Sequence, residues 1–201
     1  MISSKPFSQA CENNKVPILQ VIKDVYLPGV TVFEIGSGTG QHASFFSKNL
    51  PGVRWQPSDR KENIRGIQAW CEDEPNANLN APIILDVTEQ FWPVSAIDAL
   101  FTANTLHIMS WDVVQIFFKR IAENLKIGAV ACIYGPFNYN GTYTSASNAS
   151  FDAWLKSRDP LSGIKDFEAV LALAVAAGLT LLQDVAMPAN NRLLVLVKVE
   201  C

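Results

Sequence analysis

The stretch that decides the fold is Val30-Thr31-Val32-Phe33-Glu34-Ile35-Gly36-Ser37-Gly38-Thr39-Gly40. Its first six residues are mostly apolar and β-branched, which is typical of a buried strand. Glycine is needed where such a strand turns sharply into a helix, or where a ligand approaches the backbone. The turn alone accounts for one or two glycines, whereas Gly36, Gly38 and Gly40 stand at three alternate positions. This spacing favours a loop that binds a ligand at the start of the following helix.

The spacing of these glycines also separates two classes of ligand. The dinucleotide pattern G-x-G-x-x-G would place its third glycine at position 41, which is Gln41. The observed pattern, E-x-G-x-G-x-G, resembles motif I of the class I S-adenosylmethionine-dependent methyltransferases. The resemblance implies that the loop faces the methionine and ribose part of S-adenosylmethionine. It assigns five residues to cofactor binding: Glu34, Gly36, Ser37, Gly38 and Gly40.

Strand patterns and helix patterns alternate on both sides of this loop, which is typical of a parallel sheet covered by helices. After the strand at 30–35, further strands are predicted at 53–59, 83–86, 97–102, 129–134, 179–185 and 193–199. The last two are joined by a short connection, so we expect them to be antiparallel to each other. The sequence therefore predicts one α/β domain, residues 1–201, with a doubly wound, mostly parallel seven-stranded sheet and helices on both faces.

The predicted helices follow the 3.6-residue spacing of apolar side chains. Upstream of the first strand, a helix is expected to begin at Pro17 and to end at Leu27, before Pro28-Gly29. Later helices are predicted at 43–50, 64–70, 114–125, 151–155 and 167–177. A long polar loop at 135–148 interrupts the alternation, and loops of this length in a compact domain are usually functional or mobile.

Two acidic residues follow the next two strands of the predicted sheet. Asp59 ends the second strand, about 20 residues after the glycine loop, where an acid accepts hydrogen bonds from ribose hydroxyls. Asp86 ends the third strand and is followed by Val87. The methyltransferase resemblance implies that Asp86 accepts from the adenine amino group and that the amide of Val87 meets the ring. Acids also cap strand ends for structural reasons. Here the glycine loop, Asp59 and Asp86 follow the ends of three consecutive strands, which favours cofactor binding.

Asn104 and His107 come directly after the fourth strand, at the carboxyl edge of the predicted sheet. Class I methyltransferases place the reacting sulfonium and the acceptor beside this edge, next to the point where the strand order reverses. We therefore predict that Asn104 contacts the cofactor and that Asn104 and His107 lie nearest the transferred methyl group. His107 is a candidate general base. The alternative is a histidine that bonds a neighbouring group and shapes the pocket.

Composition and charge argue against several other classes of protein. The net charge is −3 with no cluster of basic residues, which argues against a nucleic-acid partner. No run approaches the ~18 apolar residues of a membrane span, and the first residues do not resemble a secretory signal. The four cysteines form no metal-binding pair and are expected to be free thiols, so we predict no metal. A cytoplasmic protein is expected.

Further segments resemble a methyltransferase-like family known as domain of unknown function 938. They are the stretches around Asn14-Lys15, Trp55-Asp59, Tyr134-Asn138, Ser147-Asp152 and Met187-Asn191. The similarity covers almost the whole chain, and Asn13 stands where we expect a basic residue. Asn14 is assigned to the cofactor. The asparagine-rich segments near residues 14, 138 and 190 are expected to cover the site and contact the acceptor.

The resulting hypothesis is S-adenosylmethionine-dependent methyl transfer to a small-molecule acceptor. Small acceptors are favoured because the chain has no basic groove and no additional substrate domain. Two alternatives stay open. One is a protein that binds the cofactor without catalysis. The other is a nicotinamide-dependent oxidoreductase, against which Gln41 argues because it stands where a dinucleotide-binding loop has its third glycine. The acceptor and the oligomeric state stay unassigned.

Overall fold

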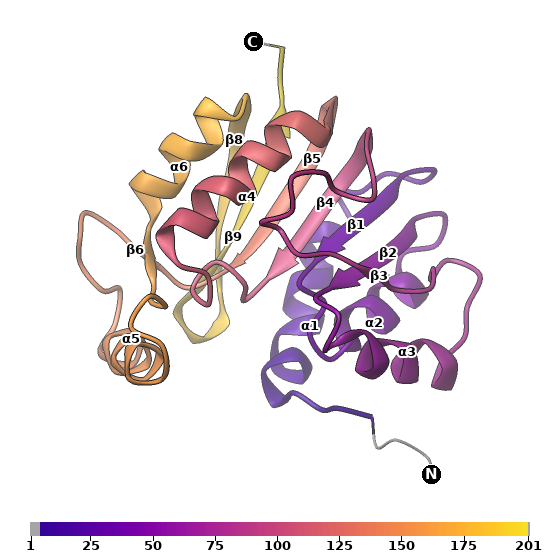
Figure 1. Ribbon diagram of the computed structural model, residues 1–201, viewed down its shortest axis with the longest axis horizontal. Helices are drawn as coiled ribbons and strands as arrows, with labels where there is room; N and C mark the ends of the chain where they lie inside the picture. The colour runs from indigo at the N-terminus through magenta and orange to yellow at the C-terminus, as the bar shows by residue number, and fades with distance from the viewer. Residues whose placement is uncertain (1–4, 201) are drawn as a thin grey trace.

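The central feature of the computed structural model, which describes residues 5–200, is a seven-stranded sheet (Figure 1). Its strands are β1 (Thr31–Ile35), β2 (Arg54–Asp59), β3 (Ile83–Ile84), β4 (Ile97–Ala103), β5 (Leu125–Gly135), β8 (Leu179–Met187) and β9 (Asn191–Lys198). They lie in the order β3-β2-β1-β4-β5-β9-β8. The first five are parallel, and β9 is antiparallel to both β5 and β8. The predicted fold class is therefore confirmed, including the antiparallel final pair.

The strand order reverses between β1 and β4. The chain first builds outward through β2 and β3, then returns to the other side of β1 to form β4 and β5. Ligands of open α/β sheets bind at the carboxyl ends of the strands that flank such a reversal. The glycine loop follows β1 and Asn104 follows β4, so both lie at this position.

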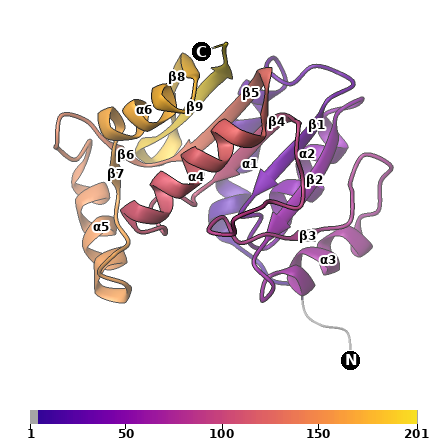
Figure 2. The same ribbon diagram turned by 45° about the horizontal axis from the view of Figure 1, so that its top comes forward.

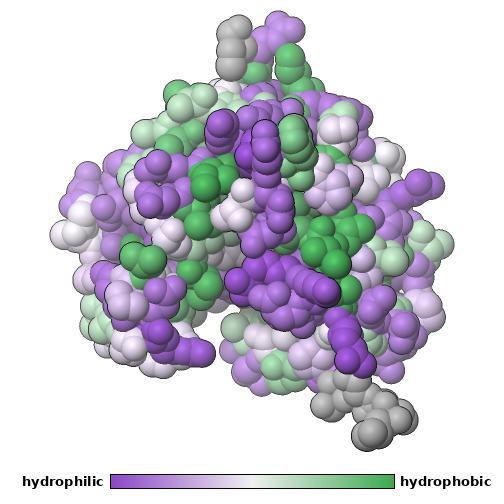
Figure 3. Space-filling view, in the orientation of Figure 1, coloured by the Kyte–Doolittle hydropathy of each residue, from purple (hydrophilic) through white to green (hydrophobic). Residues whose placement is uncertain are grey.

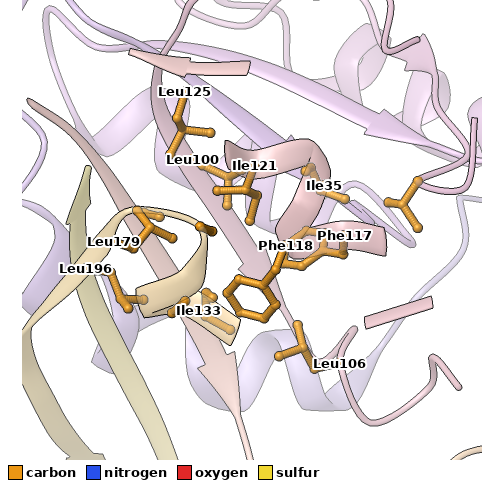
Figure 4. Packing of buried hydrophobic residues seen from close by; sticks show 14 of the residues in the cluster. Ile35, Leu100, Leu106, Phe117, Phe118, Ile121, Leu125, Ile133, Leu179 and Leu196 are labelled. Atoms are coloured by element: carbon orange, nitrogen blue, oxygen red, sulfur yellow. The ribbon is translucent and has the colours of Figure 1, made fainter. Parts of the chain in front are cut away.

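Helices cover both faces of the sheet (Figure 2). They are α1 (Gln9–Ile22), α2 (Gln41–Asn49), α3 (Ile64–Asp73), α4 (Trp111–Asn124), α5 (Ala146–Arg158) and α6 (Phe167–Ala176). One core joins α1 and α2 to the sheet through Ile18, Phe46 and Trp55. On the other face, α4 and α6 pack their apolar stripes on β4, β5 and β9 (Figure 4).

The first helix differs from its predicted bounds. It begins at Gln9 rather than Pro17 and ends at Ile22 rather than Leu27, so Pro17 lies inside it. Ser8 is the N-cap, and its side-chain oxygen accepts from the amide of Cys11. A proline inside a helix loses one backbone hydrogen bond, and here the burial of Ile18 and Ile22 on the sheet outweighs that loss. The prediction was wrong because proline was taken as a helix start.

The region after β5 is also more regular than predicted. The stretch expected to be a loop contains β6 (Phe137–Asn138), which pairs in parallel with β7 (Lys165–Asp166) to form a separate two-stranded sheet. Helix α5 begins at Ala146 rather than near residue 151, with Ser145 as its N-cap. Figures 1 and 2 show α5 projecting from the body beyond the carboxyl edge of the sheet. The pairing of such short strands depends on tertiary contacts and has no local signal.

Several expectations concern the ends and the surface of the chain. Cys11, Cys71 and Cys132 are free thiols, whereas Cys201 lies outside the described residues. Residues 1–4, which belong to the segment expected not to be a secretory signal, also lie outside them. Within residues 5–200, no helix is long and apolar enough to cross a membrane.

Candidate functional site

A cavity of about 710 Å³ opens at the carboxyl ends of β1 and β4. This volume lies within the range of small-molecule sites. Six segments line the cavity: 8–14, 36–42, 103–108, 134–136, 147–154 and 188–191. Figure 3 shows the surface hollowed along its lower edge, between the part formed by α5 and the part over α1, α2 and α3. The three asparagine-rich segments predicted to cover the site all contribute to this wall.

The glycine loop forms the inner wall, and its three glycines meet different surroundings. A Cβ atom on Gly36 would lie 2.3 Å from Cγ2 of Thr105, and one on Gly40 would lie 2.9 Å from Cα of Ile67. These two positions allow close packing within the fold. Gly38 also has a positive φ of 56°, but a Cβ there would meet nothing within 4 Å. Because Gly38 lines the cavity, its open side borders the space of the cavity.

Helix α2 starts at the end of this loop. Its first amide, that of Gln41, donates to Oγ1 of Thr39 at 3.4 Å, and the next two amides have no capping side chain. Gly40 is the N-cap and has no side chain to accept from them. The first N–H groups of a helix have no intrahelical acceptor and favour negatively charged groups. The start of α2 is therefore suited to hold a carboxylate or hydroxyl group of a ligand.

Glu34 lies beneath the loop rather than in the wall of the cavity. Its side chain is buried and accepts from Ser37 Oγ at 2.8 Å and Trp55 Nε1 at 3.0 Å. Burial raises the pKa of Glu34 to about 7, although both hydrogen bonds act to lower it. Ser37 itself lines the cavity, so Glu34 acts on the site through the hydroxyl that it orients.

Asp59 is coupled to the glycine loop by a direct hydrogen bond. Its Oδ2 accepts from the amide of Gly38 at 2.7 Å, and its Oδ1 accepts from Asn63 and from the amide of Arg60. A carboxylate has about four acceptor positions, so Oδ2 keeps capacity for a further donor. Asp59 is 8% exposed and does not line the main cavity.

Asp86 and Val87 lie farther from the cavity. Asp86 accepts from the amide and hydroxyl of Thr88, and these hydrogen bonds lower its pKa. It borders a separate surface depression that also contains Arg60 and the exposed Phe91. Val87 is buried in the core beside α4. Of the predicted site residues, Gly36, Ser37, Gly38, Asn14, Asn104 and His107 share the main cavity.

Asn104 and His107 form the wall after β4. Asn104 has a φ of 60°, a left-handed conformation that asparagine tolerates better than most residues, and its amide donates to the carbonyl of Tyr134. The His107 ring is buried, and its centroid lies 5.3 Å from that of Phe151 in an edge contact. Burial, together with the positive charge of Lys165, lowers the pKa of His107 to about 4. The imidazole is therefore neutral at pH 7.

Asn14 lines the cavity from α1 and joins that helix to α2. The amide oxygen Oδ1 of Asn14 accepts from Nε2 of His42 at 2.6 Å. Because an amide oxygen only accepts, His42 carries its proton on Nε2. Burial lowers the pKa of His42 to about 4, which keeps it neutral. His42 was not among the predicted site residues, although its place two residues after Gly40 puts it in the first turn of the helix.

Gln41 occupies the position at which a dinucleotide loop has its third glycine. Its side chain is buried and accepts from the amide of Ser8 at 2.6 Å, while its Nε2 donates to Glu12 at 2.6 Å. Gln41 thus fixes α1 over the glycine loop. Among residues 5–200, no group of three metal-binding side chains lies close enough to hold an ion.

The chain belongs to the family described as "Protein of unknown function (DUF938)", whose model matches residues 5–198. Its fold is that of the class I methyltransferases, as solved structures show. An O-methyltransferase family protein from Burkholderia thailandensis superposes with a TM-score of 0.82 at 14% identity, covering 95% of this chain and 58% of that protein.

Two further structures show the same similarity of fold. An O-methyltransferase family 2 protein from Planctomyces limnophilus, in complex with apigenin, has a TM-score of 0.80 at 16% identity and covers 94% of this chain and 60% of that one. The mitomycin 7-O-methyltransferase MmcR has a TM-score of 0.80 at 16% identity, with 94% and 54% covered. This chain thus spans little more than half the length of the structures it matches.

Proposed function

We propose that this protein transfers a methyl group from S-adenosylmethionine to a small-molecule acceptor, on one domain formed by residues 1–201. The observation that carries the proposal is the open side of Gly38, which faces the cavity at the reversal between β1 and β4. The family resemblance and the methyltransferase fold support the choice of cofactor.

The residues of the glycine loop suit the polar groups of this cofactor. The uncapped amides of His42 and Ala43 at the start of α2, together with the side chain of Asn14, would hold the methionine end. The remaining acceptor capacity of Asp59 suits a ribose hydroxyl, and Asp86 is the proposed partner of the adenine amino group. When bound, the cofactor supplies a methyl group attached to a positively charged sulfur. The positive sulfur makes the methyl carbon a good electrophile.

The protein contributes to such a reaction mainly by alignment and by exclusion of water. Asn104 and His107 lie at the carboxyl end of β4, where they would contact the acceptor beside the methyl group. Because the imidazole of His107 is neutral at pH 7, it accepts or donates one hydrogen bond there without adding charge. Helices α1 and α5 enclose the same cavity from two sides.

A turnover experiment tests the catalytic proposal against a protein that only binds the cofactor. The protein is incubated with methyl-labelled S-adenosylmethionine and a protein-free metabolite extract. We expect label in a small product and stoichiometric S-adenosylhomocysteine. Cofactor binding without product in any extract fraction would favour the non-catalytic alternative.

A further inference from the structure

The outer end of the cavity has an aromatic and apolar wall. Phe151 and Trp154 of α5 stack with ring centroids 5.8 Å apart and an interplanar angle of 17°. Phe151 also makes the edge contact with His107, so this wall continues to the end of β4. Ile108 lines the same end and is 54% exposed, which leaves an apolar surface open to a ligand.

No charged side chain of the described residues lines this cavity. Six charged residues lie on the segments around it, and each has a partner of its own. The positive charge of Lys165 also helps to lower the pKa of His107. Asp152 accepts from the amide of Ile164 and from Tyr143, and it pairs with Lys156. Glu12 pairs with Lys15 and accepts from Gln41. Lys165 donates to the carbonyl of Gly163, and Arg158 lies over the outer ring of Trp154.

The absence of charge in the lining constrains the acceptor. At this outer end, away from the α2 amides proposed to hold the charged methionine end of the cofactor, a carboxylate, phosphate or ammonium group loses hydration and finds no charged side chain in the lining, which is costly. An aromatic ring instead gains from burial and from edge or offset contact with Phe151. The neutral Asn104 and His107 can then bond a single polar group of that ring.

We propose that the methyl acceptor is an uncharged, planar aromatic molecule with one polar substituent, seated between Ile108 and the Phe151–Trp154 wall. The inference rests on the proposed function, because it treats the inner end of the cavity as the cofactor site. Its support is the stacked aromatic wall and the lack of charged side chains among the described residues that line the cavity.

A series of matched probes tests the preference for an uncharged ring. 2-Naphthol, 2-naphthoate and 2-naphthylmethylammonium share one ring system and differ in charge at pH 7. They are titrated by calorimetry into the full chain in the presence of S-adenosylhomocysteine. We expect 2-naphthol to bind at least about tenfold more tightly than either ion, and about fivefold more tightly than its saturated analogue decahydro-2-naphthol.

A substitution tests whether this end of the cavity sets the preference. Ile108→Lys places a cation in the wall and should improve the affinity for 2-naphthoate at least about tenfold. Val175→Lys is the control, because Val175 is 62% exposed on α6 and does not line the cavity. It should leave all three affinities unchanged.

The two proposals fail in different ways. Failure of S-adenosylhomocysteine alone to bind would overturn the proposed function, and that titration is run first. With the cofactor product bound, an ion that binds as tightly as 2-naphthol would overturn only the acceptor assignment. The acceptor assignment would also be overturned if 2-naphthol shows no binding at about 1 mM, or if both lysine variants change the affinities equally.

Discussion

At the scale of single residues, Gly38 is the glycine of the loop at which a Cβ would meet no atom of the described residues within 4 Å. Its neighbours Gly36 and Gly40 are confined by Thr105 and Ile67, but the side of Gly38 on which a Cβ would stand is open. Asp59 holds the amide of Gly38 and so fixes the loop from below. A substitution at Gly38 should therefore affect ligand binding more than folding.

Gly38→Asn tests this expectation, because asparagine tolerates a positive φ. The variant should fold and lose at least about tenfold in affinity for S-adenosylmethionine, since the side chain fills ligand space. Gly128→Asn is the matched control: Gly128 also has a positive φ with nothing within 4 Å, but it lies outside the cavity. Equal affinities of the two folded variants in calorimetric titration would contradict the assignment of this space to the cofactor.

His107 provides a second test at this scale. Since burial lowers its pKa to about 4, it is a weak base at neutral pH, and general-base catalysis is most effective near the working pH. We expect His107→Gln to keep the saturated rate within about threefold and to raise KM for the acceptor. The wild-type rate should show no histidine titration between pH 5.5 and 8, because its imidazole is neutral throughout this range. A fall in saturated rate of about 100-fold or more would show that His107 removes the proton.

At the scale of elements, the connection between β8 and β9 brings strained backbone into the site. Ala189 has φ 56° and ψ 37° in this connection and lines the cavity. A non-glycine residue in the left-handed region costs about 1 kcal/mol or more. The strain is offset by the long antiparallel pairing of β8 and β9 on either side of the connection.

Replacement of Ala189 by glycine should relieve this strain. We expect Ala189→Gly to raise the free energy of unfolding by about 0.5–1 kcal/mol, since the gain exceeds the added entropy of the unfolded chain. Ala96→Gly should do the same, because Ala96 has a φ of 54° outside the site. Urea denaturation of both variants measures the change. Destabilisation of either variant by more than about 0.5 kcal/mol would show that its methyl group packs usefully.

The elements that could be predicted from the sequence are those with a local signal. The strand before Gly36 and helix α4 follow regular apolar patterns, so periodicity was sufficient to predict them. The predicted start of α1 was wrong because a proline usually stands in the first turn of a helix. Here the packing of Ile18 and Ile22 on the sheet keeps Pro17 within the helix. Strands β6 and β7 have two residues each and pair over a long separation, which no local pattern indicates.

At the scale of the whole molecule, the strand order gathers distant segments around one edge. The glycine loop, Asn104 and the connection at 188–191 are far apart in sequence and share one cavity because the strands that carry them end there. The carboxyl-edge rule therefore predicted part of the lining of the cavity. It did not predict His42 or the wall of α5, whose positions depend on how helices pack. Asp86 and Val87 followed the strand pattern but lie away from the main cavity.

Buried titratable groups should make the stability of the whole molecule depend on pH. His42 and His107 have folded pKa values of about 4, so the unfolded chain binds more protons between pH 4 and 6.5, and their contribution to stability is lost as pH falls through this window. Glu34 acts oppositely: its folded pKa is about 7, so its contribution is present below pH 4.5 and is lost as pH rises to 7.

Glu34→Gln isolates the contribution of Glu34 to the pH dependence of stability, because the glutamine amide does not titrate. The stability of this variant relative to wild type should increase by about 2 kcal/mol from pH 5 to pH 7, and should stay constant above pH 8. Urea denaturation at each pH measures the difference. A difference that does not vary with pH would show that Glu34 is ionised in the folded protein across the whole range.

The most direct test of the central claim is the titration of the wild-type chain with S-adenosylmethionine, S-adenosylhomocysteine and NAD. The open side of Gly38, the uncapped amides of α2 and the side chain of Gln41 in place of a third glycine lead to one expectation. Both adenosyl compounds should bind with one-to-one stoichiometry, and NAD should not bind measurably. Tight binding of NAD, or no binding of either adenosyl compound at about 1 mM, would contradict the assignment of this cavity to a methyltransferase.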